Sequence, residues 1–173
     1  DKVLDAGVKI LKIEGRGRSP EYTKVTVGVY SEAVKAIQNG EFTEEKIAQW
    51  TERLRSVYNR DFWDGYYLGR KMGEWTQRYG SQATKTKIFV GTVTNFFAKI
   101  NVAEIRMETQ DLNVGDDIMI IGPTTGVYED KVSEIRVDLK PVESTEKGEL
   151  CSIPVKDVIR RGDKVYKVID AES

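Results

Sequence analysis

The sequence of 173 residues contains no histidine, and this absence excludes several kinds of site. Serine and cysteine hydrolases generally use an imidazole to accept the nucleophile's proton, and zinc sites usually draw on histidine or several cysteines. Because cysteine is also limited to one residue, the chain alone cannot form a Ser-His-Asp triad, a Cys-His pair, or a typical zinc or iron-sulfur site. We therefore expect this chain by itself to hold no cofactor and no metal.

The single cysteine, Cys151, rules out an intrachain disulfide and fits a reducing, cytoplasmic compartment. Its position in an expected strand, between Leu150 and Ile153, favours a buried and inert thiol over a nucleophile. The sequence has no run of 18 apolar residues and no charged-then-apolar leader, so we expect no membrane span. Lys plus Arg (27) and Asp plus Glu (28) nearly cancel, so no overall field favours nucleic acid or an acidic membrane.

The first 80 residues predict helices around one short strand. Residues 8–13 are an apolar run that follows Gly7, and they predict a buried parallel strand in an αβα unit of the kind found in parallel sheets and barrels. Ser19 as N-cap and Pro20 as first helical residue predict a helix from Pro20 to about Asn39. The stretch "TKVTVGVY" alternates and is β-branched, so a strand is the local alternative.

A second helix is predicted after Thr43, which has the residue type of an N-cap. Its expected buried stripe consists of Ile47, Trp50, Leu54 and Val57. The segment "YNRDFWDGYYLG" then gathers the aromatic residues Tyr58, Phe62, Trp63, Tyr66 and Tyr67. Two interpretations are open: the segment wedges into a neighbouring core, or it forms a platform that stacks a base or another ligand.

Residues 81–87 lose the apolar period and predict a linker between a domain over 1–80 and a domain over 88–173. The second domain contains six short stretches with a period of two, separated by Gly, Asn, Asp and Pro. This pattern predicts a small closed or nearly closed β-barrel of about six strands, which makes the fold class of the chain α+β.

Two tight turns punctuate the expected barrel, at "VGD" and at "RRGD". Gly115 and Gly162 allow positive φ, and Asp116 and Asp163 are expected to stabilise the turns through side-chain to backbone hydrogen bonds. "RRGD" is therefore interpreted as a hairpin corner and not as an adhesion motif. Asp116 and Asp117 are neighbours on a strand and point to opposite faces, so they cannot form an aspartic protease pair.

The succession "VGTVTN", "LNVGDDIMIIGP", "KVSEIRVDLKPVESTEKGELCSIPV" and "VIRRGDKVYKV" is similar to the second-domain barrel of translational GTPases of the elongation factor Tu type. Such barrels are docking modules, and the fold alone assigns no chemistry. This resemblance implies a protein or RNA partner for the barrel.

Both halves together resemble the C-terminal region of the collagenase-like peptidase family of unassigned catalytic type, peptidase family U32. The resemblance rests on "GVKILKIEGRGRSPEYTKVTVGVYSEAVKA", on "FTEEKIAQWTERLRSVYNRDFWDGYYLG" and on the trailing barrel, from about Leu4 to Val168. It implies an eight-stranded β/α barrel whose last strand ends in "KIEGR", followed by a helical extension and an accessory β-barrel. The chain would then be the C-terminal fragment of a protease, not catalytic alone, whose partner is the missing N-terminal part of the barrel.

Some relatives in that family instead act in oxygen-independent hydroxylation of transfer RNA, ribosomal RNA or quinone precursors. They hold an iron-sulfur cluster on cysteines that precede the "KIEGR" strand, so any cluster or metal would belong to the full-length protein and not to this chain. The alternative function is therefore an RNA- or protein-binding accessory module of a hydroxylation protein, with an oligomeric state that the sequence leaves open. The family commonly has Met and Lys where this sequence has Gly17 and Arg18.

The charged residues of "LKIEGRGRS" are the best site candidates, because working residues of β/α barrels lie at the C-terminal ends of strands. Lys12, Glu14 and Arg16 are the catalytic candidates. Arg16, Arg18 and Ser19 are the anion-binding candidates, since glycines allow close approach of a ligand and a helix N-terminus adds positive charge. A structural ion pair, Lys12 with Glu14 or Glu14 with Arg16, is the alternative.

Overall fold

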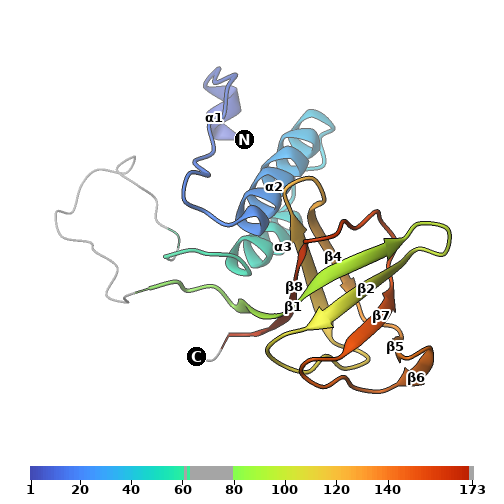
Figure 1. Cartoon of the computed structure of the whole chain (residues 1–173). Coiled ribbons are helices and arrows are strands. Elements are labelled where there is room, and N and C mark those ends of the chain that lie inside the picture. The colour runs from blue at the N-terminus through green and yellow to red at the C-terminus, as the bar shows by residue number, and fades with distance from the viewer. Residues whose placement is uncertain (61, 63–79, 172–173) are drawn as a thin grey trace. The chain divides into compact units, whose positions relative to one another are not determined.

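The computed structural model describes residues 1–60, 62 and 80–171. The chain divides into two compact units, both seen in Figure 1. The helical unit comprises Asp1–Thr84 together with the C-terminal end of the chain, and the sheet unit comprises Lys85–Asp170. The predicted combination of helix and sheet is confirmed.

The helical unit contains α1 (Lys2–Asp5), α2 (Pro20–Gln38) and α3 (Glu44–Arg55). Helix α2 has Ser19 at its N-cap and Pro20 in its first turn, and Gly40, with φ of 71°, follows its C-cap. Helix α3 is capped by Thr43, whose Oγ1 accepts a hydrogen bond from the Lys46 N–H at 3.4 Å. Both predicted helices are therefore confirmed, and the strand alternative for the first of them is wrong because the caps outweigh its β-branched residues.

Helices α2 and α3 pack through a small apolar core and a polar clamp. The buried residues are Val29, Ala36 and Trp50. The carboxylate of Glu32 on α2 accepts hydrogen bonds from two guanidinium nitrogens of Arg53 at 2.5 and 3.0 Å and from the Trp50 indole N–H at 3.1 Å. The Arg53 guanidinium, with the Trp50 indole, lowers the pKa of the Glu32 carboxyl.

Residues 8–13 do not form the expected strand. Val8, Ile10 and Leu11 are 41%, 85% and 43% exposed, so the run is not buried either. A parallel strand takes its hydrogen bonds from neighbouring strands, and no described strand pairs with this segment. The αβα unit is thus present only as its helices, because its middle element lacks partners among the described residues.

The sheet unit is a single antiparallel sheet with the strand order β4-β3-β8-β1-β2-β7-β5-β6. Its hydrogen-bonded ladder is open, with β4 and β6 at the two edges. The strands are β1 (Lys85–Phe97), β2 (Val102–Met107), β3 (Asp117–Gly122), β4 (Gly126–Lys131), β5 (Ile135–Val137), β6 (Lys140–Val142), β7 (Leu150–Pro154) and β8 (Lys164–Asp170).

The sheet differs from the expected barrel of about six strands in strand number and in closure. One predicted strand, over "GVYEDKVSEIRVD", is two strands, β4 and β5, and β6 has no equivalent in the prediction. Strand β6 is only three residues long and contains Pro141, which cannot donate to a ladder and is confined to sheet edges. Its position at the edge of the sheet follows from that residue.

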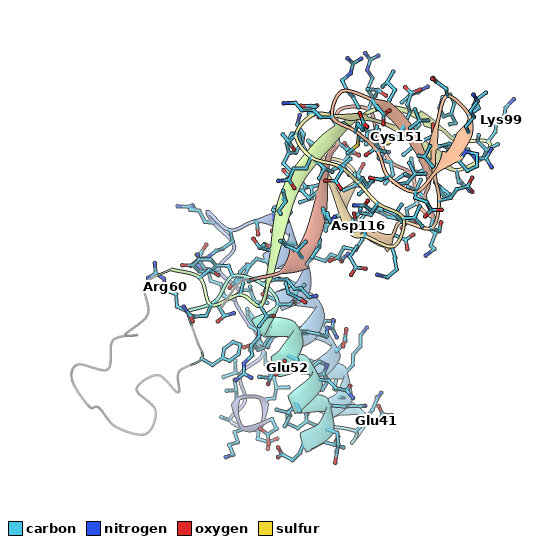
Figure 2. The ribbon with its side chains drawn as sticks, turned by 90° about the horizontal axis from the view of Figure 1, so that it is seen from below. Glu41, Glu52, Arg60, Lys99, Asp116 and Cys151 are labelled. Atoms are coloured by element: carbon cyan, nitrogen blue, oxygen red, sulfur yellow. The ribbon has the colours of Figure 1, made fainter. Side chains whose placement is uncertain are left out.

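The core of the sheet unit is one large cluster of mainly apolar side chains. Its most buried side chains include Val90, Val93, Ile105, Ile120 and Ile153, each fully buried. Cys151 lies in the same core, inside the sheet unit in Figure 2. Strand β1 passes close to β2 at Gly91, where an added Cβ would lie 2.2 Å from the Arg106 carbonyl oxygen. Only glycine allows this approach of the two backbones.

The two predicted turns form as expected. Gly115 and Gly162 each have φ of 91°. The Asp116 carboxylate accepts a hydrogen bond from the Asn113 N–H at 2.8 Å, and the Asp163 carboxylate accepts one from the Arg160 N–H at 2.9 Å. "RRGD" is therefore a hairpin corner, in agreement with the sequence interpretation. In the part of the chain that the structure describes, no helix has the length and apolar character needed to cross a bilayer.

Candidate functional site: a cationic cavity on the helix pair

The charged residues after position 11 form a compact turn ahead of α2. The Glu14 carboxylate accepts a hydrogen bond from the Arg16 N–H at 2.6 Å, and the Arg18 N–H donates to the Gly15 carbonyl at 3.0 Å. Gly17 takes φ of 70° within this turn. Glu14 thus holds the backbone of the turn, and among the described residues it forms an ion pair with neither Lys12 nor Arg16.

The structure does not bring the five site candidates from the sequence together in one place. Lys12, Glu14 and Arg16 are exposed, and none of them lines the cavity beside the helix pair. Ser19 is the N-cap of α2, and its side chain forms no capping hydrogen bond. Arg18 alone of the five candidates reaches the cavity. Their catalytic and anion-binding roles stay predictions.

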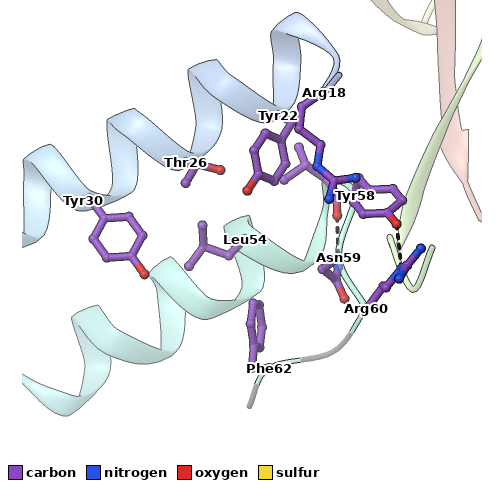
Figure 3. Close-up of a pocket in the computed structure, with 10 residues that line it drawn as sticks. Arg18, Tyr22, Thr26, Tyr30, Leu54, Tyr58, Asn59, Arg60 and Phe62 are labelled. Carbon is purple, nitrogen blue, oxygen red and sulfur yellow. Dashed lines mark hydrogen bonds between the residues drawn. The ribbon is translucent and has the colours of Figure 1, made fainter. Parts of the chain in front are cut away.

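The cavity lies between α2, α3 and the residues that follow α3, and has a volume of about 290 Å³ (Figure 3). Such a volume is at the lower end of the range for small-molecule sites. The side chains that line it come mainly from one face of α2 and from residues 54–62: Arg18, Tyr22, Thr26, Tyr30, Leu54, Val57, Tyr58, Asn59, Arg60 and Phe62.

Two guanidinium groups flank one phenol at one end of the cavity. The Arg18 guanidinium carbon lies 4.1 Å from the centre of the Tyr58 ring and 5.8 Å from that of Tyr22. Arg60 Nε donates a hydrogen bond to the Tyr58 hydroxyl at 2.8 Å, drawn as a dashed line in Figure 3. Hydrogen bonding by Arg18 and then by Arg60 lowers the pKa of the Tyr58 phenol.

The lining of the cavity has a net positive charge. Among the residues that the structure describes, it contains the two arginines and no acidic side chain. In the described ranges 1–60, 62 and 80–171, neither guanidinium forms an ion pair with a carboxylate. Leu54 and Val57 add an apolar wall, and Tyr22 and Tyr30 add aromatic surface. The arrangement combines donors for an anion with surface for an apolar body.

Thr26 places a polar group in the same cavity without a hydrogen-bond partner. The residue is 7% exposed, and its Oγ1 is buried and unbonded within the described part of the chain. A threonine in a helix commonly donates to the carbonyl one turn earlier, so an unbonded hydroxyl here is unusual. A buried hydroxyl without a partner costs free energy, and a ligand in the cavity would supply the missing partner.

The sequence contained one indication of this face that was not used. Tyr22, Thr26 and Tyr30 recur every four residues, which places them on one side of α2, and Arg18 precedes the helix at the same spacing. Tyr58 and Phe62, from the predicted aromatic segment, do line the cavity. Trp63, Tyr66 and Tyr67 lie outside the described residues. Arg60 carried no signal, because its approach to Tyr58 depends on the chain path after α3.

The thiol of Cys151 and the carboxylates of Asp116 and Asp117 are not arranged for catalysis. Burial, and next the charge of Glu149, raise the pKa of the Cys151 thiol to about 12, so the thiol stays protonated at neutral pH. Asp116 forms an ion pair with Lys167 at 2.7 Å, and Asp117 forms one with Lys131 at 2.8 Å. These separate partners confirm that the two carboxylates do not act as a pair. Among the described residues, no group of three or more His, Cys, Asp or Glu side chains is arranged to hold a metal ion.

Comparison with known proteins gives matches over almost the whole chain. Residues 1–77 match the protein family described as Peptidase family U32. The chain is 52% identical over 167 residues, 96% of its length, to a Porphyromonas gingivalis protein named collagenase, of which it covers 40%. It is 30% identical over 125 residues to the Bacillus subtilis tRNA hydroxylation protein P1, a match that covers 70% of the chain and 29% of that protein.

A solved structure also matches part of the chain. It is the C-terminal domain of a Geobacillus thermoleovorans protein named for the U32 peptidases, with 15% identity and a TM-score of 0.44 over 46% of this chain and 90% of that one. The chain spans 40% or less of the length of the two sequence relatives above. By the match of its first 77 residues and by its 52% identity with a collagenase, the chain belongs to peptidase family U32.

Proposed function

We propose that the chain supplies the rim and accessory parts of a collagenase-like peptidase and does not itself carry the group that attacks the peptide bond. The observation that carries the proposal is the 52% identity with a protein named collagenase over 96% of the chain. Because the chain spans 40% of that protein, the remaining parts of a catalytic centre can lie outside it.

The chemistry of the chain's own residues supports a role without the nucleophile. The sequence has no histidine to activate a serine or a cysteine. Its one thiol is buried and has a pKa of about 12. A thiol nucleophile must be exposed and partly ionised near neutral pH, and Cys151 meets neither condition.

The N-terminal segment supports a place at a barrel rim. Val8, Ile10 and Leu11 expose an apolar, strand-forming run that finds no partner in the described residues. In the complete enzyme, residues 8–13 pair as the last barrel strand, and Lys12, Glu14 and Arg16 then lie at its C-terminal end. The N-terminal part of the barrel is the partner that this arrangement needs.

A chimera tests the proposal. The segment of the Porphyromonas gingivalis collagenase that aligns with this chain is replaced by the chain, and cleavage of fluorescent gelatin is measured. We expect the chimera to cleave gelatin and the isolated chain to be inactive. The chimera with Arg16→Gln is expected to cleave at least about a hundredfold more slowly, as for loss of an electrostatic catalytic group. Arg161→Gln, an exposed arginine of the sheet unit, is the matched control. Gelatin cleavage by the isolated chain, or full activity of the Arg16→Gln chimera, would refute the proposal.

The alternative is an RNA- or protein-binding accessory module of a tRNA hydroxylation protein, and the similarity to the Bacillus subtilis protein favours it. In that case the redox group belongs to another part of the enzyme, since Cys151 is the sole cysteine and is buried. Affinity of a protein for RNA rests largely on cationic contacts with phosphates, whereas this chain has a net charge of −1. Fluorescence anisotropy with labelled tRNA tests this alternative, and salt-dependent binding by the chain would favour it.

A further inference from the structure

We propose that the cavity beside α2 and α3 binds a carboxylate attached to an apolar body about the size of one amino acid. This site is distinct from the exposed Lys12, Glu14 and Arg16. It goes beyond the peptidase proposal, and binding in it is measured without any peptidase activity. Two kinds of molecule can supply such a carboxylate: a free carboxylic acid, and the C-terminal residue of a peptide.

The two guanidinium groups favour a carboxylate over a neutral ligand. Arg18 and Arg60 approach the same phenol, that of Tyr58, from different segments of the chain. Arg60 uses its Nε for Tyr58, which leaves its terminal nitrogens as donors. Guanidinium groups match the planar, two-oxygen geometry of a carboxylate. Within the described lining, no carboxylate competes for them.

The buried hydroxyl of Thr26 is a second and independent observation that points to a ligand. Its Oγ1 is buried and forms no hydrogen bond within the described residues, although a hydroxyl can both donate and accept one. Thr26 lies on the face of α2 that lines the cavity, and Arg18 enters the same cavity from the turn just before the helix. A ligand that carries a polar group in addition to its carboxylate, such as the amide of an acylated amino acid, can supply a hydrogen-bond partner for this hydroxyl.

The remaining lining sets the nature and size of the ligand body. Tyr22 and Tyr30 present aromatic surface, and Leu54 and Val57 present aliphatic surface. Aromatic side chains favour contact with another ring in stacked or edge-on geometry. A volume of about 290 Å³ holds one amino-acid-sized group and excludes a folded protein domain. N-acetyl-L-phenylalanine has the carboxylate, the amide and the ring in one molecule and is the probe that we choose.

Isothermal titration calorimetry with the full chain tests the proposal. We expect N-acetyl-L-phenylalanine to bind and its C-terminal amide, which lacks the charge, to bind at least about tenfold more weakly, the change expected for loss of one charged hydrogen bond. The tripeptide Gly-Gly-Phe with a free carboxylate, compared with its amide, distinguishes the two sources. Binding of the tripeptide acid identifies a peptide C-terminus as a ligand, and binding of the acetylated amino acid alone identifies a free acid.

Three variants locate the binding. Arg18→Gln and Thr26→Val are each expected to weaken binding of the acid about tenfold or more, and Arg161→Gln, in the sheet unit, is expected to leave it unchanged. Thr26→Val is also expected to raise the melting temperature of the ligand-free chain, because it removes an unbonded buried hydroxyl; this readout separates loss of a ligand contact from loss of folding. Equal binding of acid and amide, no binding of any probe, or unchanged affinity in Arg18→Gln would overturn the proposal.

Discussion

The two units of this chain use their buried residues in different ways. In the sheet unit, sixteen buried residues form one continuous apolar core, and the buried Asp163 is hydrogen-bonded within its turn. In the described part of the helical unit, three buried residues form the helix-pair core, while the buried hydroxyl of Thr26 is unbonded. Most buried apolar side chains, which stabilise the fold, thus lie in the sheet unit. The buried hydroxyl without a hydrogen-bond partner, that of Thr26, lies in the described part of the helical unit.

This difference indicates a division of labour. A unit whose polar groups are satisfied internally has little to offer a ligand, whereas unsatisfied buried groups persist where function requires them. The helical unit also contains all five residues that the sequence proposed as site candidates, from Lys12 to Ser19. We therefore propose that the helical unit binds ligands and that the sheet unit provides most of the stability, and the following changes test that proposal.

The largest loss of stability is expected from Ile105→Ala in β2. Ile105 is fully buried in the sheet core, and removal of three carbons leaves a cavity that costs about 2–5 kcal/mol of unfolding free energy. Urea unfolding followed by circular dichroism measures the change. The matched control is Val158→Ala, at a valine that is 57% exposed, for which a change below about 0.5 kcal/mol is expected. A small loss in Ile105→Ala would contradict a tightly packed sheet core.

Gly122→Ala in β3 is expected to cost less, about 1–3 kcal/mol. An added Cβ would lie 1.7 Å from Oδ1 of Asp163. The carboxylate must therefore move, which weakens the hydrogen bonds that its other oxygen, Oδ2, accepts from the Arg160 N–H and the Thr125 hydroxyl. Gly148→Ala, with no atom near the added Cβ, isolates the cost of the backbone conformation, since Gly148 has φ of 93°. Thermal unfolding compares the two. A milder effect at Gly122 than at Gly148 would show that the Asp163 turn can shift freely.

Acid should destabilise the sheet unit through Asp130. Hydrogen bonds from Lys156 and then Tyr128 lower the pKa of the Asp130 carboxyl to about 2, from 3.8. A carboxyl whose pKa is lowered in the folded state stabilises that state above its unfolded pKa, so this contribution is complete above pH 4 and is lost as the pH falls toward 2. We expect about 1–2 kcal/mol from this source.

Asp130→Asn checks the origin of that acid effect. Unfolding free energies of the wild type and the variant, measured between pH 6 and pH 2, should differ most at pH 6 and converge near pH 2. A difference that stays constant over this range would show that the ion pair of Asp130 with Lys156, at 2.7 Å, is not the cause.

The smallest effect is expected from the polar clamp of the helix pair. Glu32→Gln removes the charge that binds Arg53 and Trp50, but the Glu32 side chain is 48% exposed, so we expect a loss of about 0.5–1 kcal/mol. The loss should shrink in high salt, because exposed ion pairs are screened. A loss as large as that of Ile105→Ala would show that the helical unit depends on this clamp and has too little apolar core.

Much of the fold could be predicted from local sequence, because caps and turns are local. Ser19 and Pro20 predicted the start of α2, and Gly162 with Asp163 predicted a hairpin corner. Residues 8–13 were predicted as a buried strand but form none in this chain, since a strand depends on partners and no described strand pairs with them. Strand β6 was missed because it is short and carries Pro141.

The candidate site could be predicted only in part. Arg18 was identified from its place in a charged, glycine-rich run, and Tyr58 from an aromatic segment. Their contact at 4.1 Å joins residues forty positions apart, which no spacing rule relates. The unbonded state of Thr26 depends on packing around α2 and therefore could not be read from the sequence.

Nuclear magnetic resonance of the ¹⁵N-labelled chain tests the division of labour most directly. Titration with N-acetyl-L-phenylalanine should shift the backbone amide signals of Arg18, Tyr22, Thr26 and Tyr58, which lie around the cavity, and should leave the amide signals of the sheet core, such as those of Ile105 and Ile120, unchanged. Shifts confined to residues 85–170, or no shifts in the helical unit, would contradict the assignment of binding to the helix pair.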